Sequence, residues 1–252
     1  MKIAYTSDLH LEHSLMGPLT NNDGADVLVL AGDIVVNDSV NARGSGKIHK
    51  WFADTAKNFD HVIYIMGNHE YYDSKFPAAF DELRAKFSYI ENLHVLENEQ
   101  IELDGKVFWC GTLWTDCTKS DPLAMYAIKY GMNDFAYIKL TKDSKFTPET
   151  MVEYHNMSLR KMNTSADVVV THHCPSIKSV SPAYYNSKLT PAYYSDLENF
   201  ILDSEIKHWI CGHTHYNIDY HLGNTQVHMN SRGYPHEQSF NNFELKYFDI
   251  DD

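Results

Sequence analysis

The apolar positions of the chain fall into short runs separated by amphipathic stretches. Lys2–Thr6, Val27–Ala31 and Val62–Met66 are apolar and rich in β-branched residues, and polar residues follow each of them at once. Such runs are typical of strands that are buried on both faces. Apolar residues at helical spacing predict helices over Lys47–Phe59 and Phe76–Phe87. The alternation of strands and helices indicates an α/β fold.

The later part of the chain continues the same alternation. Asp104-Gly105 predicts a tight turn between two further strands. Thr147 and Pro148 are suited to the N-cap and first position of a helix that ends near Met162. We expect strands around Val95 and at Ile101–Leu103, Val107–Cys110, Val168–Thr171 and His208–Cys211, a helix near Ser195–Leu202, and antiparallel strands at Ile218–Tyr220, Thr225–Met229 and Phe243–Ile250. Two mixed sheets flanked by helices accommodate this order as a four-layer α/β/β/α sandwich.

The length of 252 residues suits one domain with a substantial core, so we expect a single domain over residues 1–252. The polar and aromatic stretch at about residues 115–146 is interpreted as an insertion or lid. Ser181–Tyr185 and Thr190–Tyr194 nearly repeat each other, which predicts a tyrosine-rich loop. This loop lies either beside the site or in solvent.

Composition narrows the class of partner. The chain has 21 Lys and Arg against 34 Asp and Glu, a formal charge of -13, and it contains no run of basic residues. This balance repels a polyanion and makes nucleic acid an improbable partner, although a metal site still attracts a phosphate locally. The four cysteines are too few for a disulfide scaffold. No signal peptide or membrane-spanning run is evident, so we expect a cytoplasmic protein without a membrane partner.

Polar residues of the ligand type follow several of the predicted strands. Asp33 and Asn68, taken singly, are ordinary turn formers. Their repetition after successive strands instead favours a site at the carboxyl ends of the strands. In an extended segment, the i, i+2 spacing of Asp8 and His10, and of His213 and His215, turns both side chains the same way. Five motifs carry these residues, namely Asp8-Leu9-His10, Gly32-Asp33, Gly67-Asn68-His69-Glu70, Thr171-His172-His173-Cys174-Pro175 and Gly212-His213-Thr214-His215.

The five motifs in this order resemble those of the calcineurin-like metallophosphoesterase superfamily. Further segments, among them Glu70-Tyr71-Tyr72 and Asn230-Ser231-Arg232-Gly233-Tyr234, are similar to a subgroup of small bacterial and phage phosphoesterases. The resemblance implies a phosphatase or phosphodiesterase with a dinuclear metal centre. It implies that one metal is held by Asp8, His10 and His215, the other by Asn68, His172 and His213, and that Asp33 bridges them.

The resemblance also implies the chemistry. A hydroxide that bridges the two metals is the expected nucleophile on a phosphomonoester or phosphodiester of a small substrate. Asp33 and His69 are the expected catalytic residues, with His69 donating to the leaving oxygen and oriented by Glu70 or another carboxylate. Arg232 is either a phosphate clamp or part of a structural salt bridge. His173 is expected to face the substrate or to support a ligand.

Some features are left open by the sequence. Nitrogen and oxygen donors without a thiolate suit Mn, Fe, Zn, Co or Ni, with manganese among the candidates. A metal-dependent nuclease and a catalytically silent scaffold of the same fold are the alternative functions. The nuclease needs a basic path for the strand, which the composition does not supply. The substrate, the metal and the oligomeric state are not determined.

Overall fold

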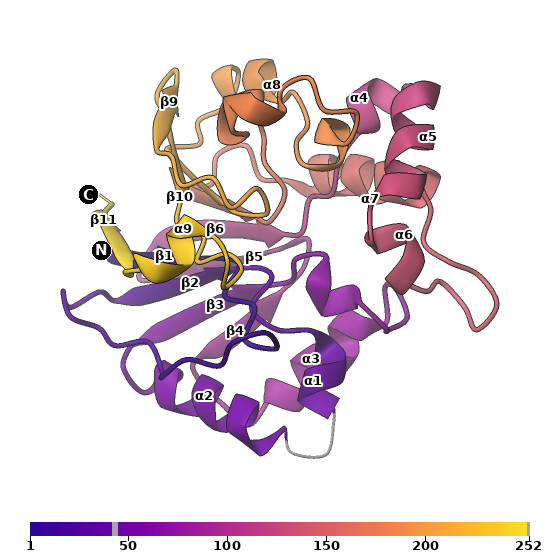
Figure 1. Cartoon of the computed structure of the whole chain (residues 1–252). Helices are drawn as coiled ribbons and strands as arrows, with labels where there is room; N and C mark the ends of the chain where they lie inside the picture. The colour runs from indigo at the N-terminus through magenta and orange to yellow at the C-terminus, as the bar shows by residue number, and fades with distance from the viewer. Residues whose placement is uncertain (42–44, 251–252) are drawn as a thin grey trace.

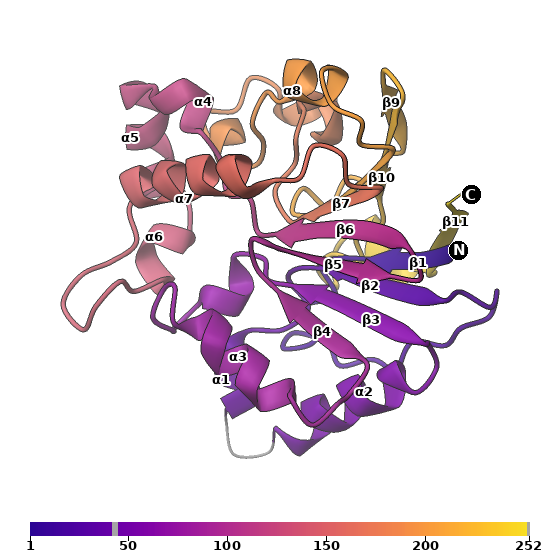
Figure 2. The same ribbon diagram turned by 180° about the vertical axis from the view of Figure 1, so that it is seen from behind.

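Two mixed β-sheets lie face to face, and helices cover the outer face of each (Figure 1). The computed structural model describes residues 1–41 and 45–250, so residues 42–44 and 251–252 of the predicted domain lie outside the described residues. The view from behind shows the same four layers (Figure 2). The predicted α/β/β/α sandwich is confirmed.

The first sheet has the order β11-β1-β2-β3-β4. Strands β1 to β4 run parallel, and β11 pairs antiparallel with β1. The strands are β1 (Lys2–Thr6), β2 (Val27–Ala31), β3 (His61–Ile65), β4 (Leu93–Leu96) and β11 (Lys246–Asp249). Its outer face is covered by α1 (Asn37–Asn41), α2 (Gly46–Ala56) and α3 (Ala79–Phe87) (Figure 1). The predicted strands are found here to within one to three residues at their ends.

The second sheet has the order β5-β6-β7-β8-β10-β9. Its strands are β5 (Glu99–Leu103), β6 (Lys106–Gly111), β7 (Val168–Thr171), β8 (His208–Cys211), β9 (Tyr220–Leu222) and β10 (Thr225–Met229). The predicted hairpin joins β5 to β6. The prediction of purely antiparallel strands near the end is wrong for β10, which pairs parallel with β8. Strand β9 lies at the edge of the sheet and pairs antiparallel with β10. The chain therefore reverses between β9 and β10, and β10 runs in the same direction as β8.

The remaining helices and short turns follow strands of both sheets. They are α4 (Cys117–Ser120), α5 (Pro122–Gly131), α6 (Asp134–Tyr137), α7 (Pro148–Lys161), α8 (Glu198–Leu202) and α9 (Gln238–Asn241), with single 3-10 turns η1 (His69–Tyr71), η2 (Ile177–Ser179), η3 (Pro182–Tyr184) and η4 (Thr190–Ala192). Helix α7 begins as predicted, because the Thr147 hydroxyl accepts from the Thr150 N–H at 3.2 Å. No helix in the described ranges is long and apolar enough to cross a membrane.

Alternate side chains of each strand enter different cores, as the pleat requires. In β2, Val29 faces the core between the sheets while Leu30 faces the helices of the first layer. In β7, Val170 faces the core between the sheets while Val169 packs against the helical layer above. Burial on both faces explains why these strands are continuous apolar runs. Each large apolar side chain buried in this way contributes about 1.5–3 kcal/mol to stability.

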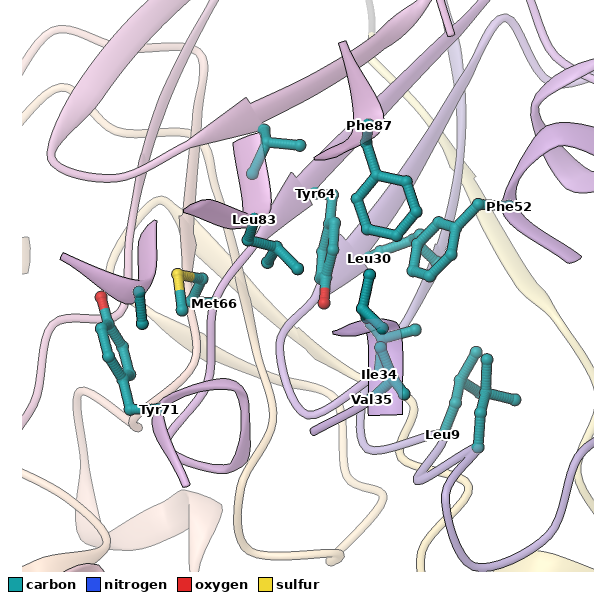
Figure 3. Packing of buried hydrophobic residues seen from close by; sticks show 14 of the residues in the cluster. Leu9, Leu30, Ile34, Val35, Phe52, Tyr64, Met66, Tyr71, Leu83 and Phe87 are labelled. Atoms are coloured by element: carbon teal, nitrogen blue, oxygen red, sulfur yellow. The ribbon is translucent and has the colours of Figure 1, made fainter. Parts of the chain in front are cut away.

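The core beneath the first sheet also anchors the predicted insertion. Leu30, Tyr64 and Phe87 lie together in this core with side chains from the helices (Figure 3). Ile128 and Phe146, from the stretch at 115–146, belong to the same cluster. The insertion is therefore packed against the sandwich through buried side chains. Its role as a lid stays a prediction.

Candidate metal centre

Loops at the carboxyl ends of five strands bring the predicted metal ligands to one rim of the sandwich. The loops follow β1, β2, β3, β7 and β8, which are neighbours within their sheets. Each ligand lies within a few residues of the end of its strand, so the strand ends fix the positions of the donors. The structure brings together Asp8, His10, Asp33, Asn68, His172, His213 and His215.

The backbone of this rim is not the extended chain that the i, i+2 spacing suggested. Asp8, His10, Asp33, His213 and His215 all adopt left-handed conformations, with φ values between 45° and 67°. For a residue with a Cβ atom this conformation costs about 1–2 kcal/mol. The paired side chains converge because the chain turns sharply at each of them. Such strain persists only where the surrounding structure holds it, which is typical of functional sites.

Two glycines allow the loops to approach one another closely. Gly32 has a φ of 85°, and a Cβ there would lie 2.5 Å from Nδ1 of His172. A Cβ at Gly67 would collide with the carboxylate of Asp33. Both glycines are therefore required by close contact between ligand loops, and Gly32 also by its positive φ.

The donor atoms form overlapping groups. Within each group, one atom from every residue lies within 4.8 Å of the others. Asp33 belongs to two of the groups, as expected of a residue placed between two metals. The groups are Asp8 with His10 and His215, Asp33 with His172 and His213, and His10 with Asp33 and His69.

Histidines surround the carboxylate of Asp33. Its Oδ2 atom lies 3.4 Å from Nε2 of His172 and 4.0 Å from Nε2 of His10. Burial by itself raises the pKa of Asp33, but the neighbouring His172, His69 and His10 bring it well below its usual value. The carboxylate is therefore ionised, and its two oxygens are available to two cations.

The metal-free protein holds protons at this rim. Burial lowers the pKa of His172, but Asp33 and Asp8 reverse this and raise it to about 10. Burial also lowers the pKa of His215, but Asp8 and Glu237 outweigh it and raise this pKa to about 10. Both imidazoles are therefore protonated near neutral pH without metal. Metal binding displaces such protons and offsets the same negative charge.

Unpartnered nitrogens indicate that the rim is built for cations. Nε2 of His213 is buried without a hydrogen-bond partner among the described residues. Burial and the neighbouring His172 lower the pKa of His213 to about 3, so this imidazole is neutral and presents a lone pair. The Nε2 atoms of His10 and His215 face each other at 3.2 Å. A donor set of nitrogen and oxygen fits two borderline or hard divalent ions.

Side chains outside the predicted set hold two of the ligands in place. The Asp8 carboxylate accepts hydrogen bonds from the hydroxyls of Ser7 and Ser231, the latter at 2.8 Å. Nδ1 of His215 lies 2.7 Å from the Glu237 carboxylate. These contacts leave the other face of each ligand free for a metal. Ser231 stands in the sequence only within a segment similar to a phosphoesterase subgroup, and neither it nor Glu237 carries a local signal for its role.

The amide of Asn68 is oriented by a residue of the insertion. Its Nδ2 atom donates to Oδ1 of Asp134 at 2.7 Å, and the Tyr72 hydroxyl donates to the same oxygen at 2.8 Å. The Asn68 carbonyl oxygen thereby faces Nε2 of His172 at 3.1 Å. Asp134 is fully buried, and burial raises its pKa. Asp134 thus lies behind a ligand.

Glu70 fixes the loop after β2. Its carboxylate accepts backbone N–H groups of Asp33 at 3.0 Å, Ile34 at 2.7 Å and Gly67 at 2.8 Å. It also accepts the Tyr64 hydroxyl at 2.8 Å. Glu70 therefore positions the bridging candidate Asp33 and does not orient His69.

His69 lies at the edge of the rim and is held from three sides. Nδ1 forms no hydrogen bond among the described residues but lies 3.5 Å from the Glu12 carboxylate, within ion-pair distance. Nε2 lies 3.2 Å from the Tyr234 hydroxyl, and the ring stacks on Tyr72 at 4.3 Å. Burial lowers the pKa of His69, but Asp33 and Glu12 outweigh burial and raise it to about 9. In the metal-free protein His69 is therefore a protonated donor.

Arg232 is occupied by contacts within the protein. Its Nη1 atom donates to the carbonyl oxygens of Leu9 at 3.0 Å and Ser14 at 2.8 Å. The guanidinium lies 4.1 Å from the centre of the Phe240 ring. These contacts fasten the loop after β1 and replace the salt bridge that was one expectation. The predicted phosphate contact of Arg232 stays a prediction without a supporting contact.

His173 lies behind the rim. It is fully buried, and its Nδ1 atom is 3.2 Å from the Thr112 carbonyl oxygen. Its ring centre lies 4.3 Å from that of His213. A supporting position next to His213 fits this geometry, while the predicted substrate contact of His173 remains untested. The neighbouring His172 has the closer approach to Asp33 and Asn68.

A pocket of about 390 Å³ opens above the rim. Asp33, Asn68, His69, His213 and His215 line this pocket, whereas Asp8, His10 and His172 belong to the donor groups but not to the lining. We call the whole rim, the seven predicted ligands together with His69, the floor. A second set of lining residues comes from the end of α5, from the two residues after it and from the tyrosine-rich loop. We call this set the wall, and it consists of Gly131, Met132, Asn133, Val180, Ser181, Tyr184, Ser187, Leu189, Thr190 and Tyr193. This answers the question left open by the sequence, because the tyrosine-rich loop lies beside the site. A pocket of this size suits a small ligand.

Comparison with known proteins agrees with this geometry. The calcineurin-like phosphoesterase family matches residues 1–217. An uncharacterized protein, L509, of Acanthamoeba polyphaga mimivirus is 29% identical over 280 residues, which cover 99% of this chain and 96% of the relative.

Solved structures share the fold at low identity. Phosphopantetheinyl hydrolase from Mycobacterium tuberculosis has a TM-score of 0.75 at 15% identity, covering 99% of this chain and 96% of the other. A dimetal phosphatase from Danio rerio has a TM-score of 0.52 at 11% identity, covering 91% and 86%. The family match and the donor groups on the rim lead to one conclusion. The chain belongs to the calcineurin-like phosphoesterase family and is a phosphoric ester hydrolase that depends on two metal ions.

Proposed function

We propose that this protein hydrolyses a phosphomonoester or phosphodiester bond of a small substrate, with a hydroxide that bridges the two metals as nucleophile. The observation that carries the proposal is the convergence of seven donor side chains on one rim, four of which also line a pocket of about 390 Å³. Two bound divalent ions would supply charge to offset the phosphate oxygens and would acidify the attacking water.

In this proposal the residues of the chain hold the two ions and supply a proton donor. Asp8, His10 and His215 would hold one ion, and Asn68, His172 and His213 the other, with Asp33 shared between them. Glu12 would keep the imidazole of His69 turned so that Nε2 faces the pocket. His69 would then donate a proton to the leaving oxygen, which avoids the release of an alkoxide.

A small substrate is supported by charge and by shape. The net charge of -13 opposes the approach of a long polyanion, and the pocket has the volume of a small-ligand site. We further propose that residues 1–252 form one domain and that the protein works in the cytoplasm, as its four buried unpaired cysteines suggest.

The test is an assay of metal-stripped protein that has been reloaded with Mn, Zn, Ni, Co or Mg. Para-nitrophenyl phosphate and bis-para-nitrophenyl phosphate separate a monoesterase from a diesterase. Asp33→Ala should abolish turnover that the metal restores, while Asp38→Ala, which removes an exposed carboxylate from α1, should leave it intact. Absence of turnover with every metal would refute the proposal and favour a scaffold. Salt-sensitive cleavage of DNA or RNA in place of the small esters would favour a nuclease.

A further inference from the structure

The wall of the pocket is aromatic and neutral, in contrast to the floor. The ring of Tyr193, which belongs to the wall, stacks on His213 of the floor at 4.8 Å. Tyr184 lines the same pocket, is 63% exposed and has no ring partner among the described residues. Met132 and Leu189 add apolar surface beside the tyrosines. The wall therefore offers flat, partly apolar surfaces at its open side.

Charge on the wall is scarce. No Lys or Arg occurs among the described residues that line the pocket, and Glu237 adds a carboxylate at one side. The neutral polar groups on the wall are an amide and hydroxyls, from Asn133, Ser181, Ser187 and Thr190. Lys188 lies in the same loop but not in the lining, so a second phosphate or a carboxylate on the bound group would meet no positive side chain in the lining. A neutral group that forms hydrogen bonds would be accommodated.

The tyrosine-rich loop is fastened to the insertion by hydrogen bonds and by one close contact within the wall, so the surface is preformed. The Thr115 hydroxyl donates to the Pro191 carbonyl oxygen at 2.8 Å, and the Asp116 N–H donates to the Ser195 hydroxyl at 2.9 Å. Gly131 packs so closely on Leu189 that a Cβ at Gly131 would meet that side chain. A surface that is ordered before binding loses less entropy when a ligand stacks on it.

We propose that the wall is a subsite for the leaving group, and that it selects an uncharged, planar aromatic group such as the base of a nucleoside. This inference rests on the proposed phosphoester hydrolysis at the floor. The phosphoryl group of the substrate meets the metals while the aromatic group lies against Tyr184. Stacking of this kind tolerates different bases, because every base has an aromatic face.

The first test measures binding without chemistry. Calorimetric titration of adenosine and of ribose into metal-free protein should show adenosine binding at least about tenfold more tightly. Tyr184→Ala should remove this preference and Tyr184→Phe should keep it. Tyr126→Ala, which removes an exposed tyrosine of α5 that does not line the pocket, is the matched control. Equal binding of adenosine and ribose would overturn the inference, as would an equal loss in the control.

The second test compares substrates with the same reacting oxygen. Adenosine 5′-monophosphate should have a kcat/KM about tenfold or more above that of ribose 5-phosphate, with the methyl diesters used if the enzyme is a diesterase. Adenosine 3′,5′-bisphosphate should react less well, and Asn133→Lys should restore its turnover by supplying a cation at the wall. Equal rates for the first pair, with para-nitrophenyl ester hydrolysis intact, would overturn the subsite alone. Preferred adenosine binding without any ester hydrolysis would support the subsite and refute the proposed function.

Discussion

The floor and the wall of the pocket are built on opposite principles. The floor concentrates buried charge, with Asp8 fully buried and Asp33 3% exposed, and its backbone is repeatedly left-handed. The wall consists of the end of α5 and a loop with two short 3-10 turns, its lining side chains are neutral, and Tyr184 is 63% exposed. Buried, strained charges need many fixed partners, whereas an exposed neutral surface needs few. The floor is therefore suited to fixed chemistry, and the wall to a choice of substrate.

Removal of the metals should produce the largest effect and should separate the two regions. Chelation should lower turnover at least about a thousandfold, because several kcal/mol of charge stabilisation is lost. It should also lower the Tm, because ions that bind only the folded state stabilise it by about 4 kcal/mol at a thousand times their Kd. Adenosine binding at the wall should persist. Turnover, Tm and adenosine binding can be measured on one sample by an activity assay, a thermal scan and a titration. The three measurements are then repeated after metal has been added back.

The metal ligands of the floor could be predicted from the sequence because of where they lie relative to the strands. Asp33 and His172 each follow directly, or within one glycine, a buried apolar strand, so a local pattern identifies both the strand and its ligand. The fold was predictable for the same reason, because runs such as β2 have no polar interruption. The left-handed backbone at Asp8 was not predictable, since it depends on contacts with Ser231, 223 positions away.

The wall had no comparable signal in the sequence. The repeated tyrosine motifs indicated a loop, but its place beside the pocket depends on hydrogen bonds such as that from Thr115 to Pro191, 76 positions apart. The contacts of Arg232 were missed in the same way, because its partners Leu9 and Ser14 lie at the other end of the chain. Contacts between residues that are far apart in the chain leave no periodic pattern of apolar residues, so a local sequence pattern does not reveal them.

Replacement of His69 should have the next largest effect. His69→Gln removes the proton donor while a polar side chain remains, so kcat should fall about a hundredfold or more. The metal content should not change if His69 is not a ligand. His13→Gln is the matched control, because His13 also lies near Glu12, at 3.9 Å, but is half exposed. Loss of a metal from the His69→Gln protein, measured by elemental analysis, would instead place His69 in the ligand set.

Asp134 connects the two regions, because it belongs to the insertion and holds a ligand of the floor. Asp134→Asn should weaken the orientation of Asn68 and lower the metal affinity about 10- to 100-fold. The effect should appear in a metal titration and disappear in activity measured at saturating metal. Asp143→Asn, an exposed change in the same insertion, should have no effect. Unchanged metal affinity in Asp134→Asn would show that the insertion serves the wall alone.

Gly131 should give the smallest effect and test whether the wall acts apart from the floor. Gly131→Ala places a methyl group against Leu189, so the two halves of the wall must separate slightly. We expect KM for the preferred substrate to rise by about tenfold or less, with kcat and metal content unchanged. Leu189→Ala should relieve the contact, and the double variant should recover most of the lost affinity, with a coupling of about 0.5–3 kcal/mol in a double-mutant cycle. Additive changes, or a fall in kcat, would mean that the wall also positions the reacting groups of the floor.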